Sequence, residues 1–149
     1  MVEVLIPDLD VLVIRKEHVK ALVKEALRDL TVEACGLLIG RVEGGRVMVE
    51  EVLIGENVKR SSTRFEVDPG LVYRAIIQAE ARGLELVGVF HSHPAPPIPS
   101  QVDVEGMRLW PIAWLIVSTL DGSYAAYTLK NGEVKPLRLE AADEAFFNP

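Results

Sequence analysis

Three glycine-containing turns each join two neighbouring apolar segments of the chain. They are Glu43-Gly44-Gly45, Asp121-Gly122 and Asn131-Gly132. Turns of this kind connect antiparallel strands as hairpins, whereas parallel strands need a much longer crossover. The turns therefore argue against a doubly wound parallel sheet and predict a mixed, largely antiparallel one.

The rest of the chain alternates between strand-like and helix-like patterns. Apolar runs predict seven strands, at residues 11–14, 35–41, 46–54, 84–93, 113–119, 123–129 and 133–139. Residues 17–30 carry one apolar stripe at helical spacing, and a second helix begins at Asp68-Pro69 and ends at Gly83. A short third helix follows Ser100. We therefore expect an α/β fold in which helices flank a mixed sheet.

Length and charge limit the class of protein. The 149 residues suit one domain, residues 1–149, with a core at about 11–139, a short N-terminal extension and an acidic C-terminal tail. Lys and Arg total 16 and Asp and Glu total 22, a net charge of −6 at pH 7. This balance argues against a surface that grips nucleic-acid phosphates. The low content of Asn (three), Gln (two) and Cys (one) favours a thermophilic source.

The single cysteine and the N-terminal residues indicate the cellular compartment. Cys35 cannot form an intramolecular disulfide, which excludes a secreted disulfide scaffold. We interpret Cys35 as a small buried residue rather than a redox or metal-binding group. The first residues lack a basic region and a cleavage pattern, and no apolar run reaches the roughly 20 residues that cross a bilayer. We expect a cytoplasmic protein without a membrane partner.

Residues 91–103 hold the most informative pattern, His-Ser-His-Pro-Ala-Pro-Pro-Ile-Pro-Ser-Gln-Val-Asp. Two of the three histidines, His91 and His93, stand two residues apart at the end of an apolar segment. In an extended strand both would lie on the same face as Val87 and Val89, close enough to grip one zinc ion. Two histidines that only form hydrogen bonds or face solvent would give the same pair.

A third metal ligand and a helix start follow the histidine pair. A catalytic zinc usually takes three protein ligands, and Asp103 is the nearest candidate for the third. Four prolines stiffen the connecting loop, and Ser100 can cap a helix that presents Asp103 toward the strand end. Ser-x-x-Asp is also a common helix start, so capping alone explains both residues without catalysis.

At this point the chain resembles the JAMM family of zinc metalloenzymes. The family motif reads His-x-His-Pro, six residues, Ser-x-x-Asp, with a Glu well upstream. His91, His93, Ser100 and Asp103 match it in order, and Glu33, followed by Ala34-Cys35-Gly36-Leu37-Leu38, matches the upstream Glu. The resemblance covers roughly residues 11–139. One departure is that five residues, not six, separate Pro94 from Ser100.

The resemblance implies a reaction and a role for each residue. It implies a single domain of cytidine-deaminase-like architecture that holds one Zn²⁺ per chain through His91, His93 and Asp103. Glu33 would take a proton from water and deliver it to the leaving amine, and Ser100 would donate a hydrogen bond to the oxyanion. Water attacks directly, so Cys35 is not needed as a nucleophile.

The substrates implied by the resemblance are ubiquitin-like modifiers and their conjugates, cleaved at the C-terminus of the modifier. The short connections resemble a minimal core, as in archaeal relatives that remove small modifiers and bacterial relatives that process sulfur-carrier proteins. Residues 61–65 are a candidate edge for an added substrate strand. A metal-free scaffold is the alternative function, and the charge argues against a nucleic-acid-linked relative. Phe146 and Phe147 leave a homodimer open.

Overall fold

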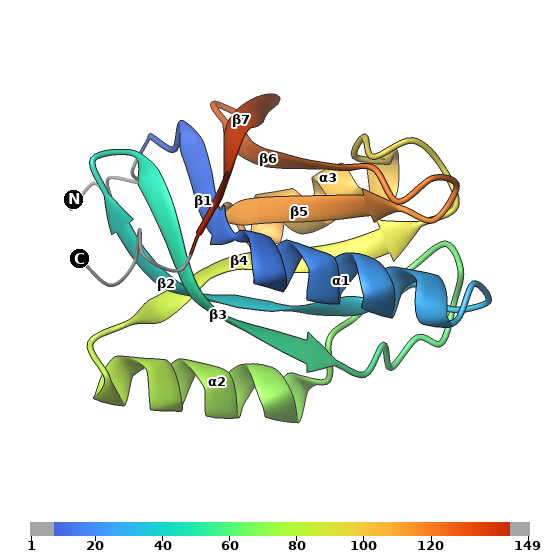
Figure 1. Ribbon diagram of the computed structural model, residues 1–149, viewed down its shortest axis with the longest axis horizontal. Coiled ribbons are helices and arrows are strands. Elements are labelled where there is room, and N and C mark those ends of the chain that lie inside the picture. The colour runs from blue at the N-terminus through green and yellow to red at the C-terminus, as the bar shows by residue number, and fades with distance from the viewer. Residues whose placement is uncertain (1–7, 144–149) are drawn as a thin grey trace.

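The computed structural model describes residues 8–143, which form ten elements (Figure 1). They are β1 (Val11–Arg15), α1 (Lys16–Arg28), β2 (Cys35–Glu43), β3 (Arg46–Gly55), α2 (Pro69–Ala81), β4 (Glu85–His93), α3 (Gln101–Leu109), β5 (Ala113–Ser118), β6 (Tyr124–Lys130) and β7 (Glu133–Ala142). Each was predicted from the sequence, with small differences at the ends. Helix α1 stops at Arg28 because the Asp29 side chain accepts hydrogen bonds from the backbone and hydroxyl of Thr31.

The strands form one closed barrel in the order β1-β3-β2-β4-β5-β6-β7, with β7 returning to β1. Four neighbouring pairs are antiparallel, and β1–β3, β1–β7 and β4–β5 are parallel. The predicted mixed sheet is confirmed, but its closure was not predicted. Closure depends on β1 pairing with β7, from Val11 opposite Arg138 to Arg15 opposite Ala142, and no local pattern encodes a pairing between the two ends of the chain.

The predicted glycine turns have the backbone that tight hairpins require. Gly44 and Gly45 have φ of 56° and 79°, and Asn131 and Gly132 have φ of 53° and 79°. Two successive residues at positive φ match the twist of the strands that they join, and glycine and asparagine adopt this conformation most readily. The hairpins β2–β3 and β6–β7 are therefore built locally, as the sequence predicts.

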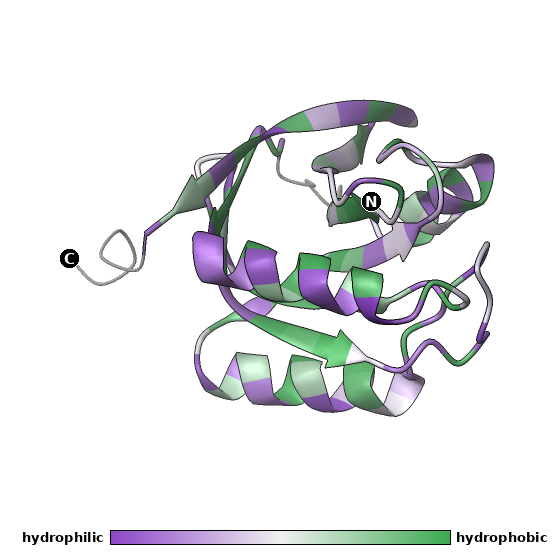
Figure 2. Ribbon diagram, turned by 45° about the vertical axis from the view of Figure 1, so that its right-hand side comes forward, coloured by the Kyte–Doolittle hydropathy of each residue, from purple (hydrophilic) through white to green (hydrophobic). Residues whose placement is uncertain are grey.

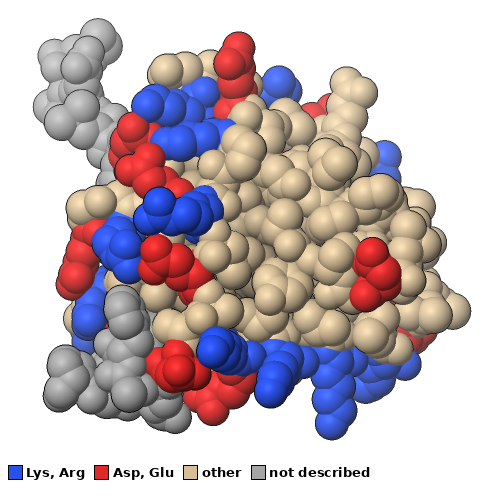
Figure 3. All heavy atoms as spheres, turned by 45° about the horizontal axis from the view of Figure 1, so that its top comes forward, with Lys and Arg blue, Asp and Glu red and all other residues tan. Residues whose placement is uncertain are grey.

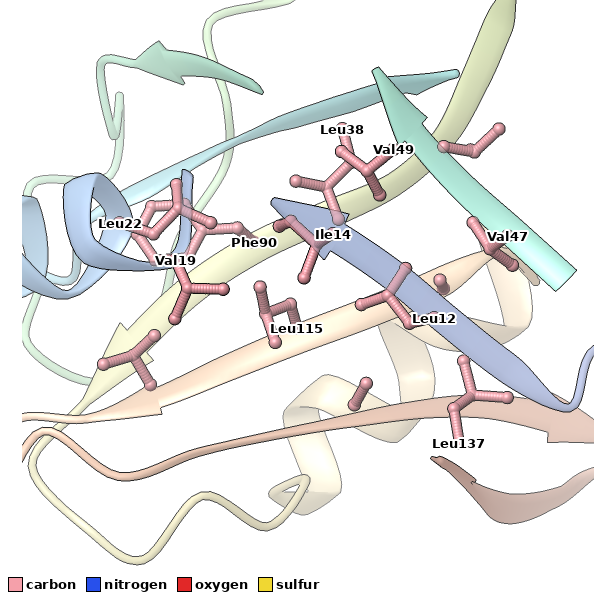
Figure 4. Close-up of a cluster of buried hydrophobic side chains, with 14 of the residues drawn as sticks. Leu12, Ile14, Val19, Leu22, Leu38, Val47, Val49, Phe90, Leu115 and Leu137 are labelled. Carbon is pink, nitrogen blue, oxygen red and sulfur yellow. The ribbon is translucent and has the colours of Figure 1, made fainter. Parts of the chain in front are cut away.

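Two buried clusters lie on opposite sides of the central strands. In Figure 4, Val19 and Leu22 of α1 meet residues of the strands, including Ile14, Phe90 and Leu115. The second cluster lies under α2 and α3 and includes Leu37, Val89, Met107 and Trp114. Figure 2 shows α1 and α2 as helices with hydrophobic and hydrophilic bands. Strand β2 contributes to both clusters, which explains its continuous apolar run.

A β-bulge in β4 changes which residues share a face with the histidines. Leu38 pairs with Gly88 and Ile39 with Leu86, so Val87 is the extra residue. Val87 packs in the α1-side cluster, whereas Val89 packs in the other. The prediction that Val87 and Val89 lie on one face was therefore wrong, because the bulge reverses the alternation between them.

Ion pairs link the start of the described chain to the β6–β7 hairpin. Lys130 lies 2.7 Å from Asp8, and Lys135 lies 2.9 Å from both Asp8 and Asp10. Hydrogen bonds from the two lysines lower the pKa of Asp8 to about 2. Figure 3 shows basic and acidic side chains intermixed on part of the surface, beside a broad uncharged area. The surface seen in that view is therefore a mixture of charges rather than a field of one sign.

The sequence left a homodimer through the C-terminal tail open and predicted no membrane partner. Phe146 and Phe147, on which the homodimer expectation depends, lie outside the described residues. Within residues 8–143, no helix has the length and the apolar character that crossing a membrane would require.

Candidate metal centre

The end of β4 places two buried histidines side by side. The His91 side chain is fully buried and His93 is 8% exposed, and their ring centroids lie 5.6 Å apart. Ser92 stands between them and is also buried. Its hydroxyl accepts a hydrogen bond from the Ala34 backbone at 2.8 Å, and its own N–H donates to the Ala34 carbonyl. Ser92 thereby ties the segment before β2 to the histidine strand.

Glu33 comes from the segment between α1 and β2. It is 4% exposed, and one of its carboxylate oxygens lies with a nitrogen of His91 and of His93 in a group whose atoms are all within 4.8 Å of one another. Two residues clamp the neighbouring backbone, since Ser92 binds Ala34 and the Ser61 carbonyl accepts the Glu33 N–H at 2.7 Å. The fold thus brings the upstream carboxylate to the histidine pair.

Asp103 reaches the histidines through the first turn of α3. Ser100 and Asp103 form a capping box, in which the Ser100 hydroxyl accepts the Asp103 N–H and Asp103 Oδ2 accepts the Ser100 N–H at 2.9 Å. The other oxygen, Oδ1, lies 3.0 Å from His91 Nε2. The proline loop is one residue shorter than the family motif, and the cap still delivers the carboxylate to His91.

Ser100 itself is exposed at the start of α3. Its hydroxyl oxygen accepts the Asp103 N–H at 3.1 Å, which leaves the hydroxyl proton able to donate to another group. The structure therefore gives Ser100 a capping role and also the hydrogen-bonding capacity for a second one.

Several buried polar atoms of this group have no hydrogen-bond partner. They are Glu33 Oε2, His91 Nδ1, His91 Nε2 and His93 Nε2. Leaving a buried polar atom unpaired costs about 1–3 kcal/mol, so a cluster of such atoms needs an explanation. His91 Nε2 and Asp103 Oδ1 are close without the alignment of a hydrogen bond, as expected of two ligands that face a common ion. Imidazole nitrogens and carboxylate oxygens are ligands that zinc favours, so the residues fit a zinc ion.

Burial and neighbouring charges shift the protonation of the group. Burial, with a smaller contribution from Asp103, raises the pKa of Glu33 to about 8. Burial and the nearby His91 lower the pKa of His93, which favours the neutral imidazole that binds metals. Burial alone would raise the pKa of Asp103, but His91 and the cap at Ser100 outweigh it and hold that pKa below its usual range.

Aromatic rings enclose His91. The Phe65 ring stacks on the imidazole with centroids 4.4 Å apart and an interplanar angle of 14°, and Trp114 meets it edge-on at 5.7 Å. The sequence indicated Phe65 only as part of a substrate-binding edge, and it indicated no role for Ser92. Ser92 is marked by its place between the histidines, but nothing in the spacing of the sequence marks Phe65.

A largely apolar cavity of about 710 Å³ opens beside Asp103. Its walls come from α2 and α3 and its floor from the strands, with Val72, Ile76, Val102, Leu109 and Trp114 among the lining residues. Phe65 lines the cavity as well, but residues 61–65 form no strand. The prediction of a strand edge there was wrong, because the Asn57 side chain already binds the Ser61 and Arg64 carbonyls.

Cys35 lies near the centre but is shielded from solvent. Its side chain is fully buried, and its thiol lies 3.8 Å from the Gly55 carbonyl. Burial, with a smaller contribution from Glu33, raises the pKa of the thiol to about 12. The thiolate is therefore scarce at neutral pH, which fits the prediction of a small buried residue.

Comparisons with known proteins agree with this arrangement. Residues 15–132 match the family of prokaryotic homologues of the JAB domain. The chain is 42% identical over 129 residues to the desampylase of Pyrococcus furiosus, covering 83% of this chain and 88% of that protein. It is 36% identical over 109 residues to a probable TtuB-protein conjugate cleaving protease of Thermus thermophilus, covering 72% and 68% of the two chains.

A solved structure gives the same result for the fold. The solution structure of a protein from Desulfitobacterium hafniense superposes with a TM-score of 0.77 and 30% sequence identity, covering 89% of this chain and 94% of that one. The family match spans most of the described residues and includes Glu33, both site histidines and Asp103. The chain therefore belongs to the family of prokaryotic JAB-domain proteins, the JAMM-type family that its His-x-His-Pro segment resembles.

Proposed function

We propose that this chain is a zinc-dependent hydrolase that cleaves the isopeptide or peptide bond at the C-terminus of a ubiquitin-like modifier. The observation that carries the proposal is the set of unpaired, buried polar atoms on Glu33, His91 and His93, next to the carboxylate of Asp103. The names of a desampylase and of a conjugate-cleaving protease among the relatives support the same class of reaction. We also propose that residues 1–149 are one domain of cytidine-deaminase-like architecture.

His91, His93 and Asp103 would hold the zinc ion. A bound zinc ion supplies Lewis acidity, which favours deprotonation of water and polarises a carbonyl. The protein's contribution is to favour the neutral form of His93 and to hold the His91 ring in place. His93 is kept neutral by burial and by His91, and His91 is held between Phe65 and Trp114.

Glu33 would move the proton. In the metal-free protein, burial raises the pKa of Glu33 to about 8, which brings its titration close to neutral pH. As a base, Glu33 would accept a proton from the attacking water, and as an acid it would return that proton to the leaving amine. Its burial keeps bulk water from competing for the proton.

Ser100 and the apolar cavity would act on the substrate. The Ser100 hydroxyl, whose oxygen is fixed by the cap, would donate a hydrogen bond to the oxyanion that forms during hydrolysis. The cavity beside Asp103 is large enough for an extended peptide with apolar side chains, which suits the tail of a modifier. The substrate tail would then lie with its scissile bond at the zinc ligands.

The first experiment measures zinc per chain by elemental analysis in protein purified without added metal. We expect about one zinc in the wild type and in His18→Ala, which changes the histidine outside the site, and little in His91→Ala. A wild type that contains no zinc and takes up none on titration would contradict the proposal and favour the metal-free scaffold.

The second experiment measures cleavage of two fusions to an archaeal-type ubiquitin-like modifier, one with a linear and one with an isopeptide bond. We expect cleavage that a chelator abolishes and added zinc restores, and that Glu33→Gln reduces by about 100- to 10,000-fold. Cleavage that persists in Glu33→Gln with full zinc would exclude Glu33 as the proton carrier.

A further inference from the structure

Asn57 is the centre of a hydrogen-bond network in the segment between β3 and α2. Its side chain is 5% exposed and forms five hydrogen bonds, all to backbone groups. The carboxamide nitrogen donates to the carbonyls of Glu33 at 3.1 Å, Arg64 at 3.0 Å and Ser61 at 3.4 Å. The carboxamide oxygen accepts from the N–H groups of Lys59 and Glu66.

This network holds both backbone polar groups of Glu33. The Glu33 N–H donates to the Ser61 carbonyl at 2.7 Å, and the Glu33 carbonyl accepts from Asn57 at 3.1 Å. Asn57 also binds the Ser61 carbonyl, so the two contacts belong to one unit. On the other side, Ala34 is fixed by Ser92. The backbone of Glu33 is therefore fixed between β4 and the Asn57 segment.

The same segment carries Phe65, whose ring stacks on His91. Asn57 binds the residues on either side of Phe65, since it accepts from the Glu66 N–H and donates to the Arg64 carbonyl. The Asn57 carboxamide thus fixes the backbone at Glu33 and also on both sides of Phe65, whose ring stacks on His91. The segment forms no regular strand. Backbone hydrogen bonds from Val58 to Glu66 and from Asp68 to Glu56 flank the bridge between Asn57 and Val67, and the Asn57 side chain binds the backbone between them.

We propose that Asn57 is a positioning residue that sets the position of the Glu33 carboxylate relative to the histidines. The inference rests on the proposed role of Glu33 in proton transfer. Asn57 acts only through the backbone, and its own side chain forms no bond to the carboxylate or to the imidazoles. A small displacement of the Glu33 carboxylate relative to the histidines would lower turnover, because proton transfer depends on distance. Such a displacement would not remove a zinc ligand.

The test compares Asn57→Asp with the same change at Asn131, in the exposed β6–β7 turn. Asn57→Asp keeps both accepted bonds and replaces the donor by an oxygen that faces the Glu33, Ser61 and Arg64 carbonyls. We expect kcat to fall about 10- to 100-fold with one zinc per chain retained, and Asn131→Asp to match the wild type. Asn57→Ala is measured in the same way, so that poor folding of one variant does not decide the result.

A double-mutant cycle separates positioning from general damage to the fold. Because Asn57 acts through Glu33, its substitution is expected to have little further effect on kcat in the Glu33→Gln background. An unchanged kcat in both Asn57 variants would overturn the inference. A fall in kcat that persists in full in the Glu33→Gln background would overturn it as well.

Hydrogen exchange of the metal-free protein provides a readout that does not need a substrate. We expect the Glu33 amide to exchange faster in Asn57→Asp, and the Val47 amide in the distant barrel to be unchanged. If the wild type with zinc cleaves no modifier fusion, the proposed function fails while this measurement still tests Asn57. Unchanged exchange at Glu33 would show that Asn57 does not hold it.

Discussion

At the scale of single residues, burial shifts the pKa of two groups of the site, Glu33 and His93. Glu33 has the clearest case, since its pKa is about 8 instead of the ordinary 4.5. The spacing of residues 91–103 predicted His91, His93 and Asp103 as metal ligands, and the resemblance to the JAMM family added Glu33 and Ser100. The structure groups Glu33 with the two histidines, and it places Asp103 Oδ1 3.0 Å from His91 Nε2 and Ser100 at the adjoining cap. The sequence did not predict the roles of Asn57 or Phe65, because these depend on contacts between segments far apart in the chain.

The raised pKa of Glu33 predicts how the stability of the metal-free protein depends on pH. Between pH 4.5 and 8 the native state keeps a proton that the unfolded state has lost, so the free energy of unfolding falls as the pH rises through this window. Glu33→Gln cannot titrate and should lack this fall. Urea unfolding of both proteins at pH 5, 6, 7 and 8 measures it, and parallel curves for the two proteins would contradict the assignment.

Cys35 gives a second prediction at this scale. With a thiol pKa of about 12 instead of 9, the thiolate fraction falls by about 1,000-fold. Iodoacetamide at pH 8 should therefore label the native protein very slowly and the urea-unfolded protein within minutes, as followed by mass spectrometry. Cleavage of a modifier fusion should survive the native treatment. Rapid native labelling with loss of cleavage would instead indicate that the thiol takes part in the reaction.

At the scale of elements, the helix starts and hairpin turns were predicted because they are local. Asp68 accepts the Gly70 N–H and Pro69 follows it, as the sequence indicated for α2. The capping box at Ser100 starts α3 in the same way. The bulge at Val87 was not predicted, since it arises from the pairing of β4 with β2 and leaves no mark in an apolar run. The bulge turns Val87 to the other face, whereas Val89 and His91 both lie on the side of Trp114.

The cap of α3 allows its structural and catalytic roles to be separated. Ser100→Ala removes the acceptor for the Asp103 N–H and should lower the free energy of unfolding by about 1 kcal/mol. Ser100→Asp provides a capping oxygen and should restore most of that stability. An ionised carboxylate accepts hydrogen bonds but donates none, so kcat should remain about 100-fold below the wild type. Urea unfolding and turnover are measured on both, and full activity in Ser100→Asp would limit Ser100 to capping.

At the scale of the whole molecule, the barrel is closed by a parallel pairing of β1 with both β3 and β7. The short β1 is buried along its length, and Figure 4 shows Leu12 and Ile14 among side chains from several strands. Glu33 and the histidines lie at the ends of elements that pack on this core, so the core fixes the separation between them. The mixed sheet was predictable from turns and apolar runs, whereas closure required contacts across the full length of the chain.

A cavity in β1 should therefore weaken the whole fold. Leu12 is fully buried, and Leu12→Ala should cost about 2–5 kcal/mol in urea unfolding. Val134→Ala in β7, where the side chain is 38% exposed, serves as the control and should cost far less. A loss below about 1 kcal/mol for Leu12→Ala would mean that β1 contributes little to the stability of the barrel.

The two oxygens of Asp103 serve two partners, the backbone of Ser100 and the imidazole of His91. In the proposed site, metal binding and the cap of α3 therefore share one carboxylate, and the free energy by which metal binding stabilises the cap equals the free energy by which the cap strengthens metal binding. The order of the first turn of α3 should therefore depend on whether a metal ion is bound. A chelator should loosen its first turn, and a tighter cap at position 100 should raise the affinity for metal. The order of α3 at the surface and the metal affinity of the buried site are thereby coupled.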